Sequence, residues 1–265
     1  MTDTPNPIPQ TPRPSAPTPP TGHGLLAGKR VLVTAAAGSG IGSTAAKRCL
    51  DEGARVVIAD KHERRLGETA DALGVSGIVC DVTDETSVQA MVDQAWNELG
   101  GIDVLINNAG LGGTAAVHEM TDDQWNIVLD VTLTGTMRVT RAMLRKMYER
   151  GSGVIVNNAS VLGWRAQAEQ AHYAAAKAGV MAFTRCAAME AAPRGVRINA
   201  VAPSLAMHAN LAKVTSDELL AELTSREAFG RAAEPWEIAT VMIFLASDYS
   251  TYMTGEVISV SSQHA

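Results

Sequence analysis

Short apolar runs rich in β-branched residues alternate with longer helical patterns from residue 29 to near the C-terminus. The predicted strands are Arg30 to Thr34, Arg55 to Asp60, Gly77 to Cys80, Ile102 to Asn107, Gly153 to Asn158, Val196 to Val201 and Glu256 to Val260. The predicted helices are Ile41 to Glu52, His62 to Leu73, Asp84 to Leu99, Thr121 to Arg150, Ala171 to Ala191 and Glu234 to Ala246. Nearly continuous apolar strands separated by helices are typical of parallel strands covered on both faces. The pattern predicts an α/β fold, a Rossmann-type doubly wound parallel sheet of about seven strands in a single domain.

Composition separates an N-terminal tail from the folded part of the chain. Eight of the eleven prolines fall within the first twenty residues, so residues 1 to 24 are predicted to be a disordered Pro-rich tail. The chain is 46% hydrophobic, which suffices for one sizeable core, and residues 25 to 265 are expected to form one globular domain. Residues 204 to 230 interrupt the alternation with small and polar residues around a short helical pattern, Ser216 to Arg226, and are predicted to be a substrate lid.

Charge and residue usage exclude several classes of protein. A net charge of -6 and a pI near 5.5 argue against nucleic acid as a partner. No apolar run reaches membrane-spanning length and no secretory signal is evident, so we expect a soluble cytoplasmic protein. The three cysteines lack the paired spacing of metal or redox motifs, and His118, His172 and His208 lack metal-ligand spacing, so no metal site is expected.

A glycine-rich turn, Gly38-Ser39-Gly40-Ile41-Gly42, follows the first predicted strand and opens into a helix. Such a turn can cradle the phosphates of a dinucleotide at the helix N-terminus. Asp60 ends the next strand, where a carboxylate can accept the adenosine ribose hydroxyls and repel a 2′-phosphate, which favours NAD(H). Asp60 can instead cap the following helix, and Lys61, Arg64 and Arg65 can attract a phosphate, so NADP(H) stays an alternative.

Tyr173 and Lys177 lie four residues apart on a predicted helix, and Ser160 lies thirteen residues before the tyrosine. Residues four apart share one helical face, so the ammonium can sit beside the phenol and lower its pKa from about 10 towards neutrality. Together with the glycine-rich turn, this tunable proton donor predicts a nicotinamide-dependent oxidoreductase.

Asn107-Asn108-Ala109-Gly110, Ser160, and Tyr173 with Lys177 occur in the order and spacing of the short-chain dehydrogenase/reductase family, which the chain resembles from about residue 29 onward. The resemblance implies that Tyr173 is the general acid/base, that Lys177 also holds the nicotinamide ribose, and that Ser160 hydrogen-bonds the reacting oxygen. It also implies that Asp81 and Val82 lie against the adenine ring. The dinucleotide site is then expected to comprise Ala36, Gly38, Ser39, Gly40, Ile41, Gly42, Asp60, Lys61, Asp81, Val82, Asn108, Ala109, Gly110, Tyr173, Lys177, Pro203 and Ser204.

The chain departs from the family pattern at five places. Thr132 stands where an asparagine helps to hold a proton-relay water, and its hydroxyl can also bind water. Ala35 stands where a glycine is usual in a turn that is one residue longer here. Pro203-Ser204 replaces a Pro-Gly pair, His208 replaces a threonine, and Ser261-Ser262-Gln263 after Val260 replaces Asp-Gly-Gly. These changes bear on the pose of the cofactor and on the lid.

The expected substrate contacts are Trp164, Arg165, Gln170 and His208, from the loops after Ser160 and after the sixth strand. An aromatic plane beside a guanidinium suits a flat or alicyclic acid derivative or the phosphates of a carrier. The alternative is that Trp164 packs on a neighbouring subunit and Arg165 forms a surface ion pair.

Within the family, residues 34–42, 157–167 and 252–263 resemble an actinobacterial reductase of steroid-ring degradation. Such enzymes act on a hydroxy or oxo group of a hydrindane carboxyl-CoA fragment. One alternative is a 3-oxoacyl-ACP or 3-oxoacyl-CoA reductase of the fatty-acid type. An alternative of another class is a non-catalytic dinucleotide-binding module. The Ala-rich helix Ala171 to Ala191 is expected to pair with its twin in a homodimer or homotetramer, unless it is buried inside the monomer.

Overall fold

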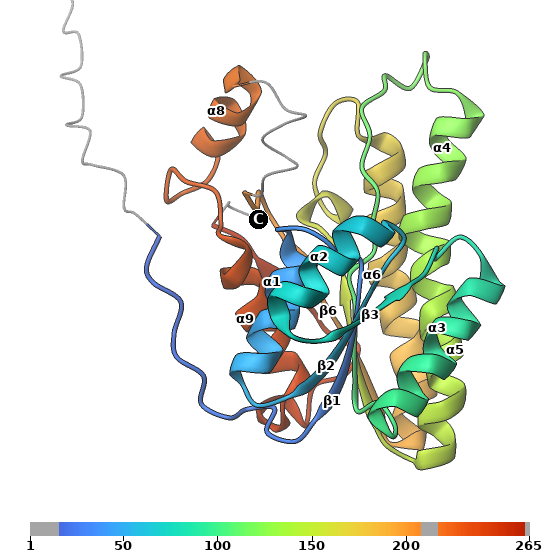
Figure 1. Ribbon diagram of the computed structural model, residues 1–265. Helices are drawn as coiled ribbons and strands as arrows, with labels where there is room; N and C mark the ends of the chain where they lie inside the picture. Colours follow the sequence, from blue (N-terminus) through green and yellow to red (C-terminus); the bar gives the residue numbers. More distant parts are fainter. Residues whose placement is uncertain (1–15, 208–216, 263–265) are drawn as a thin grey trace, which may run out of the picture.

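The computed structural model describes residues 16–207 and 217–262, and it contains one parallel sheet of seven strands in the order β3-β2-β1-β4-β5-β6-β7 (Figure 1). The strands are β1 Arg30–Thr34, β2 Arg55–Asp60, β3 Ser76–Val79, β4 Val104–Asn107, β5 Gly153–Asn158, β6 Val196–Pro203 and β7 Val257–Val260. The strand order reverses between β1 and β4, so a ligand is expected beyond the carboxyl ends of these strands. The doubly wound sheet predicted from the sequence is confirmed.

Helices cover both faces of the sheet (Figure 1). One layer holds α1 Ile41–Asp51, α2 Glu63–Leu73 and α9 Pro235–Ala246, and the other holds α3 Glu85–Leu99, α4 Asp122–Leu129, α5 Gly135–Arg150 and α6 Ala171–Ala191. Each face has its own core, because alternate strand residues point to opposite faces. Val31 and Val33 pack towards α1 and α9, whereas Leu32 between them packs towards α3 and α5. This two-sided burial explains why the strands are apolar throughout.

The prediction of one long helix from Thr121 to Arg150 is wrong in one respect. A π-helical turn, η1 at Asp130–Thr134, separates α4 from α5. The Thr132 hydroxyl accepts a hydrogen bond from Leu111, in the loop after β4. The Thr136 hydroxyl donates to the Thr132 carbonyl at 2.8 Å. Single π turns of this kind often mark functional positions in helices, and no helical periodicity reveals them in advance.

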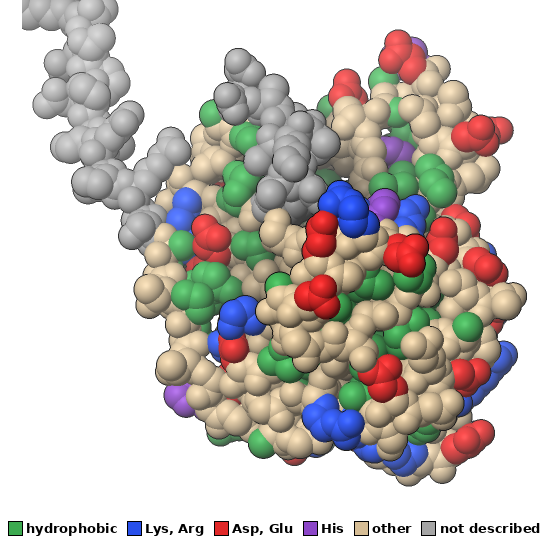
Figure 2. All heavy atoms as spheres, viewed as in Figure 1, with side chains coloured by type: hydrophobic (Ala, Val, Ile, Leu, Met, Phe, Trp, Pro, Cys, Tyr) green, Lys and Arg blue, Asp and Glu red, His purple; other side chains and the backbone are tan. Residues whose placement is uncertain are grey.

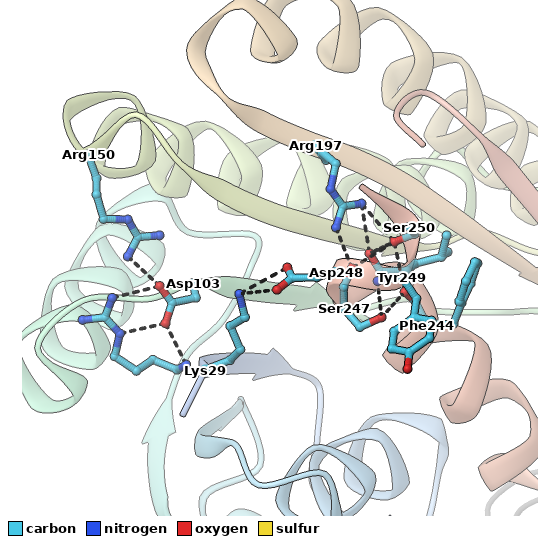
Figure 3. A network of polar contacts seen from close by, with 11 residues as sticks. Lys29, Asp103, Arg150, Arg197, Phe244, Ser247, Asp248, Tyr249 and Ser250 are labelled. Atoms are coloured by element: carbon cyan, nitrogen blue, oxygen red, sulfur yellow. Dashed lines mark hydrogen bonds and ion pairs between the residues drawn. The ribbon is translucent and has the colours of Figure 1, made fainter. Parts of the chain in front are cut away.

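The amino ends of the strands are joined by charged groups (Figure 3). Asp103, just before β4, accepts hydrogen bonds from the Arg30 backbone at 2.9 Å and from its guanidinium at 2.8 Å, and Arg150 lies 3.2 Å away. Lys29 pairs with Asp248 at 3.3 Å, and Arg197 donates to Ser250 and to three backbone carbonyls. This network fixes the edge of the sheet that lies opposite the expected site.

The N-terminal segment makes contacts that its composition did not predict. The Pro20 carbonyl accepts a hydrogen bond from Arg48 at 2.8 Å, and the His23 N–H donates to Glu52 at 2.8 Å. Arg48 and Glu52 are both buried at the end of α1 and pair with each other at 3.2 Å. The prediction of a disordered tail extending to residue 24 is therefore wrong for its last few residues, which cap a buried ion pair.

Among the described helices, none is both long and apolar enough to cross a membrane.

Candidate active site

Uncharged polar side chains gather at the carboxyl ends of β1, β4 and β5. The Asn158 amide donates to the Asn108 carbonyl oxygen at 2.9 Å, and the Asn108 amide donates to the Ala35 carbonyl at 3.0 Å. The Asn108 backbone N–H donates to the Thr34 hydroxyl at 3.0 Å. Because all three strands run in the same direction, these side chains meet at one edge of the sheet. They form a continuous hydrogen-bonded path from the glycine-rich turn to the end of β5.

Ser160, Tyr173 and Lys177 lie together at the end of this path. Ser160 follows β5, and its hydroxyl accepts from the Leu162 N–H at 3.2 Å and is hydrogen-bonded to the Tyr173 phenol. Lys177 lies one turn after Tyr173 on α6, with its Nζ 5.6 Å from the centre of the phenol ring. The predicted juxtaposition of hydroxyl, phenol and ammonium is therefore present, while their catalytic roles stay predictions.

Lys177 is held by backbone rather than by a carboxylate. Its Nζ donates to the Asn158 carbonyl at 2.6 Å, and the side chain is buried. A Cβ added at Gly110 would lie 3.2 Å from this Nζ, which explains why a glycine follows the Asn108-Ala109 pair. The ammonium is thus fixed between the ends of β4 and β5.

The pKa values of the two central groups move towards their neutral forms. Burial raises the pKa of the Tyr173 phenol to about 12, although the Ser160 hydrogen bond acts to lower it. Tyr173 is only partly buried as a side chain, yet its hydroxyl has lost enough hydration for this shift. Burial lowers the pKa of Lys177 to about 7. The expected lowering of the phenol pKa is wrong for the protein alone, because burial of the phenol outweighs the Ser160 hydrogen bond.

Thr132 contacts the loop that follows β4. Its hydroxyl accepts from the Leu111 N–H at 3.0 Å and donates to the Leu111 carbonyl at 3.2 Å. These bonds use the hydroxyl's donor and one of its acceptor positions, so one acceptor position remains. The observed contact is one that positions the loop, and the relay role stays a prediction.

The glycine-rich turn fits the diphosphate of a dinucleotide. No side chain caps the N-terminus of α1, so its first N–H groups are available to an anion. A Cβ at Gly38 or Gly40 would meet no atom within 4 Å, whereas a Cβ at Gly42 would collide with the Ala35 carbonyl. Ala35 itself adopts a φ of 49°, in the left-handed region where a glycine is usual. The turn therefore keeps open space above it despite the alanine.

Asp60 and Asp81, at the ends of β2 and β3, already hold backbone groups. Asp60 accepts from the Ala37 N–H at 3.1 Å and from the His62 N–H at 3.0 Å, and so ties the turn to the second strand. Asp81 accepts from the Thr83 N–H at 2.9 Å and hydroxyl at 2.8 Å, and its pKa lies below the ordinary value chiefly because of that backbone bond. Figure 2 shows charged side chains of both signs over the α2 region. Lys61, the residue after Asp60, is exposed.

The remaining cofactor candidates follow the same edge. Val82 and Ala109 are buried, Pro203 ends β6, and the Ser204 hydroxyl donates to Glu227 at 3.2 Å. Ala36 is buried, and its N–H donates to the Ala59 carbonyl at 3.1 Å. Ser39 and Ile41 lie in the turn itself. The structure thus places these candidates along one edge, and binding stays a prediction for each.

The substrate candidates separate into different environments. Trp164 is 52% exposed, directly after the short helix η2 Val161–Gly163. Arg165 is half-buried, and Gln170 donates to the Gly113 carbonyl at 2.8 Å, so Gln170 joins two loops rather than facing free space. His208 lies outside the described residues. The short helix predicted at Ser216 to Arg226 is α8 Asp217–Ser225, and its role as a substrate lid stays a prediction.

Two residues of the site were not predicted. Asn158 joins Asn108 to Lys177, and its position as a polar residue at the end of a buried strand could have indicated this. His172 is 1% exposed, and its Nδ1 has no hydrogen-bond partner among the described residues. A Cβ at Gly113 would lie 2.9 Å from the His172 Nε2, so the loop after β4 rests on the imidazole. No group of three or more potential metal ligands occurs in residues 16–207 and 217–262.

A phosphate-binding turn beside a Ser, Tyr and Lys cluster defines a nicotinamide-dependent oxidoreductase. The family model described as "Enoyl-(Acyl carrier protein) reductase" matches residues 35–262. The chain is 63% identical over 250 residues to a (5R,7aS)-5-hydroxy-7a-methyl-1-oxo-2,3,5,6,7,7a-hexahydro-1H-indene-carboxyl-CoA reductase of Mycobacterium tuberculosis, covering 92% of this chain and 95% of the relative. A crystal structure of a short chain dehydrogenase from Mycobacterium smegmatis has 59% sequence identity and a TM-score of 0.85, covering 95% of this chain and 99% of that one.

Two further relatives are less similar. A cis-4-hydroxycyclohexanecarboxylate dehydrogenase of Sinomonas cyclohexanicum is 41% identical over 238 residues, covering 88% of this chain and 95% of the relative. A 3-oxoacyl-[acyl-carrier-protein] reductase of Vibrio harveyi is 38% identical over 238 residues, covering 89% and 97%. The chain belongs to the short-chain dehydrogenase/reductase family. It is an oxidoreductase that interconverts alcohol and carbonyl groups with a nicotinamide dinucleotide.

Proposed function

We propose that this enzyme reduces a ketone on an alicyclic ring that carries a carboxyl-CoA thioester, with NADH as the preferred cofactor. The observation that supports this substrate class most strongly is the 63% identity to a reductase of a bicyclic carboxyl-CoA thioester. The 41% identical relative also acts on a ring hydroxyl of a carboxylate. Trp164, four residues after Ser160 and 52% exposed, offers a plane that suits the flat face of such a ring.

The protein's own groups can carry out the proton-transfer part of a reduction. A phenol with a pKa of about 12 keeps its proton at neutral pH, and this is the form that can donate to the oxygen of a ketone. Ser160 is placed to hydrogen-bond the same oxygen and stabilise its developing negative charge. Lys177 holds the end of β5 next to the phenol. The dinucleotide, when bound, supplies the hydride.

Asp60 supports the preference for NADH. Its carboxylate lies at the end of β2 and already turns towards the glycine-rich turn through the Ala37 N–H. A 2′-phosphate there would meet a like charge, which is unfavourable when partly desolvated. Lys61 is exposed next to it and is the group that would favour NADPH instead.

The second candidate is a 3-oxoacyl thioester reductase of the fatty-acid type. It is favoured by the 38% identity to the Vibrio harveyi enzyme, which is well below the identity to the bicyclic thioester reductase.

The deciding experiment compares initial rates on three substrates with NADH and NADPH. These are a bicyclic oxo-carboxyl-CoA, 4-oxocyclohexanecarboxylate and a 3-oxoacyl thioester. We expect the highest kcat/KM for the bicyclic thioester with NADH. A higher value for the 3-oxoacyl thioester would overturn the substrate class, and dinucleotide binding without turnover of any of them would overturn the catalytic proposal.

We also propose a cytoplasmic homodimer or homotetramer in which α6 pairs with its twin. The exposed residues of α6 are Ala175, Ala182, Cys186 and Met189, the last of which is 76% exposed, together with the charged Arg185 and Glu190. A small, mainly apolar helix face suits an isologous contact. Light scattering at micromolar concentration should give a mass of two or four chains, and Ala182→Glu should reduce it. A monomeric wild-type protein would contradict the proposal.

A further inference from the structure

Two of the departures from the family pattern contact the same buried carboxylate. Glu227 follows the lid helix α8 and is only 3% exposed. Its Oε2 accepts from the Ser204 hydroxyl at 3.2 Å and from the Ser262 hydroxyl at 2.7 Å. Ser204 and Ser262 both stand where the family pattern has glycine, and glycine has no side chain to donate. The two serine hydroxyls therefore share one buried acceptor, the Glu227 carboxylate.

Further hydrogen bonds involving backbone groups join the turn around Glu227 to the segments that follow β6 and β7. Its Oε1 accepts from the Leu205 N–H at 3.4 Å, and the neighbouring Ala228 N–H donates to the Ser262 carbonyl at 3.0 Å. The Ser204 N–H donates to the Val260 carbonyl at 3.1 Å, which ties the end of β6 to the end of β7. The turn at residues 226–230 is thus fixed to the segments that follow both strands.

We propose that Glu227, Ser204 and Ser262 form a latch that positions the Pro203–Ser204 segment for the dinucleotide. Ser204 directly follows the last residue of β6, at the carboxyl edge where the cofactor is expected. With glycine at both positions the segment would have neither hydroxyl to hold it, so its position would rest on backbone bonds alone. Glu227 is a positioning residue here, because it acts on the cofactor through Ser204. The inference rests on the dinucleotide site of the proposed function, but not on the identity of the substrate.

The test compares Glu227→Ala with Glu222→Ala. Both remove one negative charge close to α8, but the Glu222 side chain is 57% exposed and pairs with its neighbour Arg226. Dissociation constants for NADH and NADPH are measured by titration calorimetry, together with KM and kcat for whichever dinucleotide binds more tightly. Loss of two or three hydrogen bonds predicts that Glu227→Ala weakens dinucleotide binding by about tenfold. We expect kcat to change by less than about twofold, and Glu222→Ala to change neither.

Further variants separate positioning from folding. Glu227→Gln keeps the shape and one acceptor oxygen and should recover part of the affinity. Ser262→Gly removes only the 2.7 Å bond and keeps the protein testable if Glu227→Ala does not fold. Because Glu227 and Ser262 share the 2.7 Å bond, the effects of Glu227→Gln and Ser262→Gly on binding should add only in part in the double variant. Amide hydrogen exchange should rise in peptides covering residues 204–207 and 226–230, in the absence of any cofactor.

The latch is overturned if Glu227→Ala and Ser262→Gly bind the dinucleotide as tightly as the wild type does. It is also overturned if they lower the melting temperature without changing the dissociation constant, which would be a purely structural role. A wild-type protein that binds dinucleotide but turns over no substrate would overturn the proposed reaction and leave these binding measurements valid.

Discussion

The two ends of the sheet use polar groups in opposite ways. At the amino ends, ionised groups are paired: burial would raise the pKa of Asp103, but hydrogen bonds from Arg30 hold it below its ordinary value, and the Arg30 pKa is raised by the same contact. At the carboxyl ends, amides and hydroxyls surround a phenol and an amine whose pKa values move towards the neutral forms. The comparison shows that the Arg30–Asp103 pair is stabilised in its ionised state, whereas the phenol and the amine suited to proton transfer are not.

The largest expected effect lies at the carboxyl ends. Tyr173→Phe removes only the transferable proton, so kcat should fall by about 10²- to 10⁴-fold while dinucleotide affinity stays nearly unchanged. Tyr252→Phe is the matched control, because Tyr252 is fully exposed and lies in the segment between α9 and β7. Steady-state kinetics on both variants decide the matter. Near wild-type turnover by Tyr173→Phe would show that another group carries the proton.

A change at the amino ends should affect stability and not chemistry. Asp103→Ala removes the acceptor for the Arg30 backbone N–H and guanidinium and leaves Arg150 without its ion-pair partner there. Because both Arg30 and Asp103 are about a quarter exposed, we expect a loss of about 2 kcal/mol in the free energy of unfolding. Denaturant unfolding measures this loss. A fall in kcat of the folded variant would contradict the prediction that groups at the amino ends of the strands affect stability alone.

Asp60 is a charged group at the carboxyl end of β2, so replacing it tests whether a charge at this end of the sheet serves binding of the dinucleotide. Asp60→Ala should lower kcat/KM with NADH by roughly tenfold, because the carboxylate acceptor for the ribose hydroxyls is lost. The kcat/KM with NADPH should change less, because the same substitution removes a charge that repels the 2′-phosphate. Asp60→Asn keeps an oxygen for the Ala37 N–H and separates charge from loop geometry. If the unmodified enzyme is at least as efficient with NADPH, Asp60 does not set the cofactor choice.

The pKa of Lys177 predicts how stability changes with pH. Its folded pKa of about 7 lies below its unfolded value of about 10.4, so the unfolded chain binds more protons between these limits. The stability of the wild type should therefore rise with pH from 7 to about 10, more steeply than that of Lys177→Met. Tyr173 acts only above pH 10, where its raised pKa has the opposite effect. Melting temperatures of both proteins at pH 7.5 and 9.5 test this prediction. The same change in melting temperature for the wild type and for Lys177→Met would mean that Lys177 stays charged in the folded protein.

The strands were predictable because each is apolar and bounded by polar or glycine residues, and Tyr173 with Lys177 because helical spacing alone places them together. The π turn at Asp130–Thr134 was not predictable, because it depends on a hydrogen bond between Thr132 and a loop that is distant in sequence. The Glu227 contacts were hidden for the same reason, because they join residues 23 and 35 positions apart. The predicted direction of the Tyr173 pKa shift was wrong because the burial of the phenol cannot be seen from residue spacing.

The smallest expected effect concerns the N-terminal segment, where composition and structure disagree. Deleting residues 1–24 removes the Pro20 carbonyl and the His23 N–H from Arg48 and Glu52, a buried pair at the end of α1. Two lost hydrogen bonds to charged groups, offset by water that can replace them, suggest a destabilisation of about 1 kcal/mol. Deleting residues 1–15 is the matched control, because it leaves both contacts in place. We expect a melting temperature a few degrees lower for the longer deletion only, with kcat unchanged in both. Equal melting temperatures for the two deletions would show that these contacts add nothing to stability, as the Pro-rich composition alone had indicated.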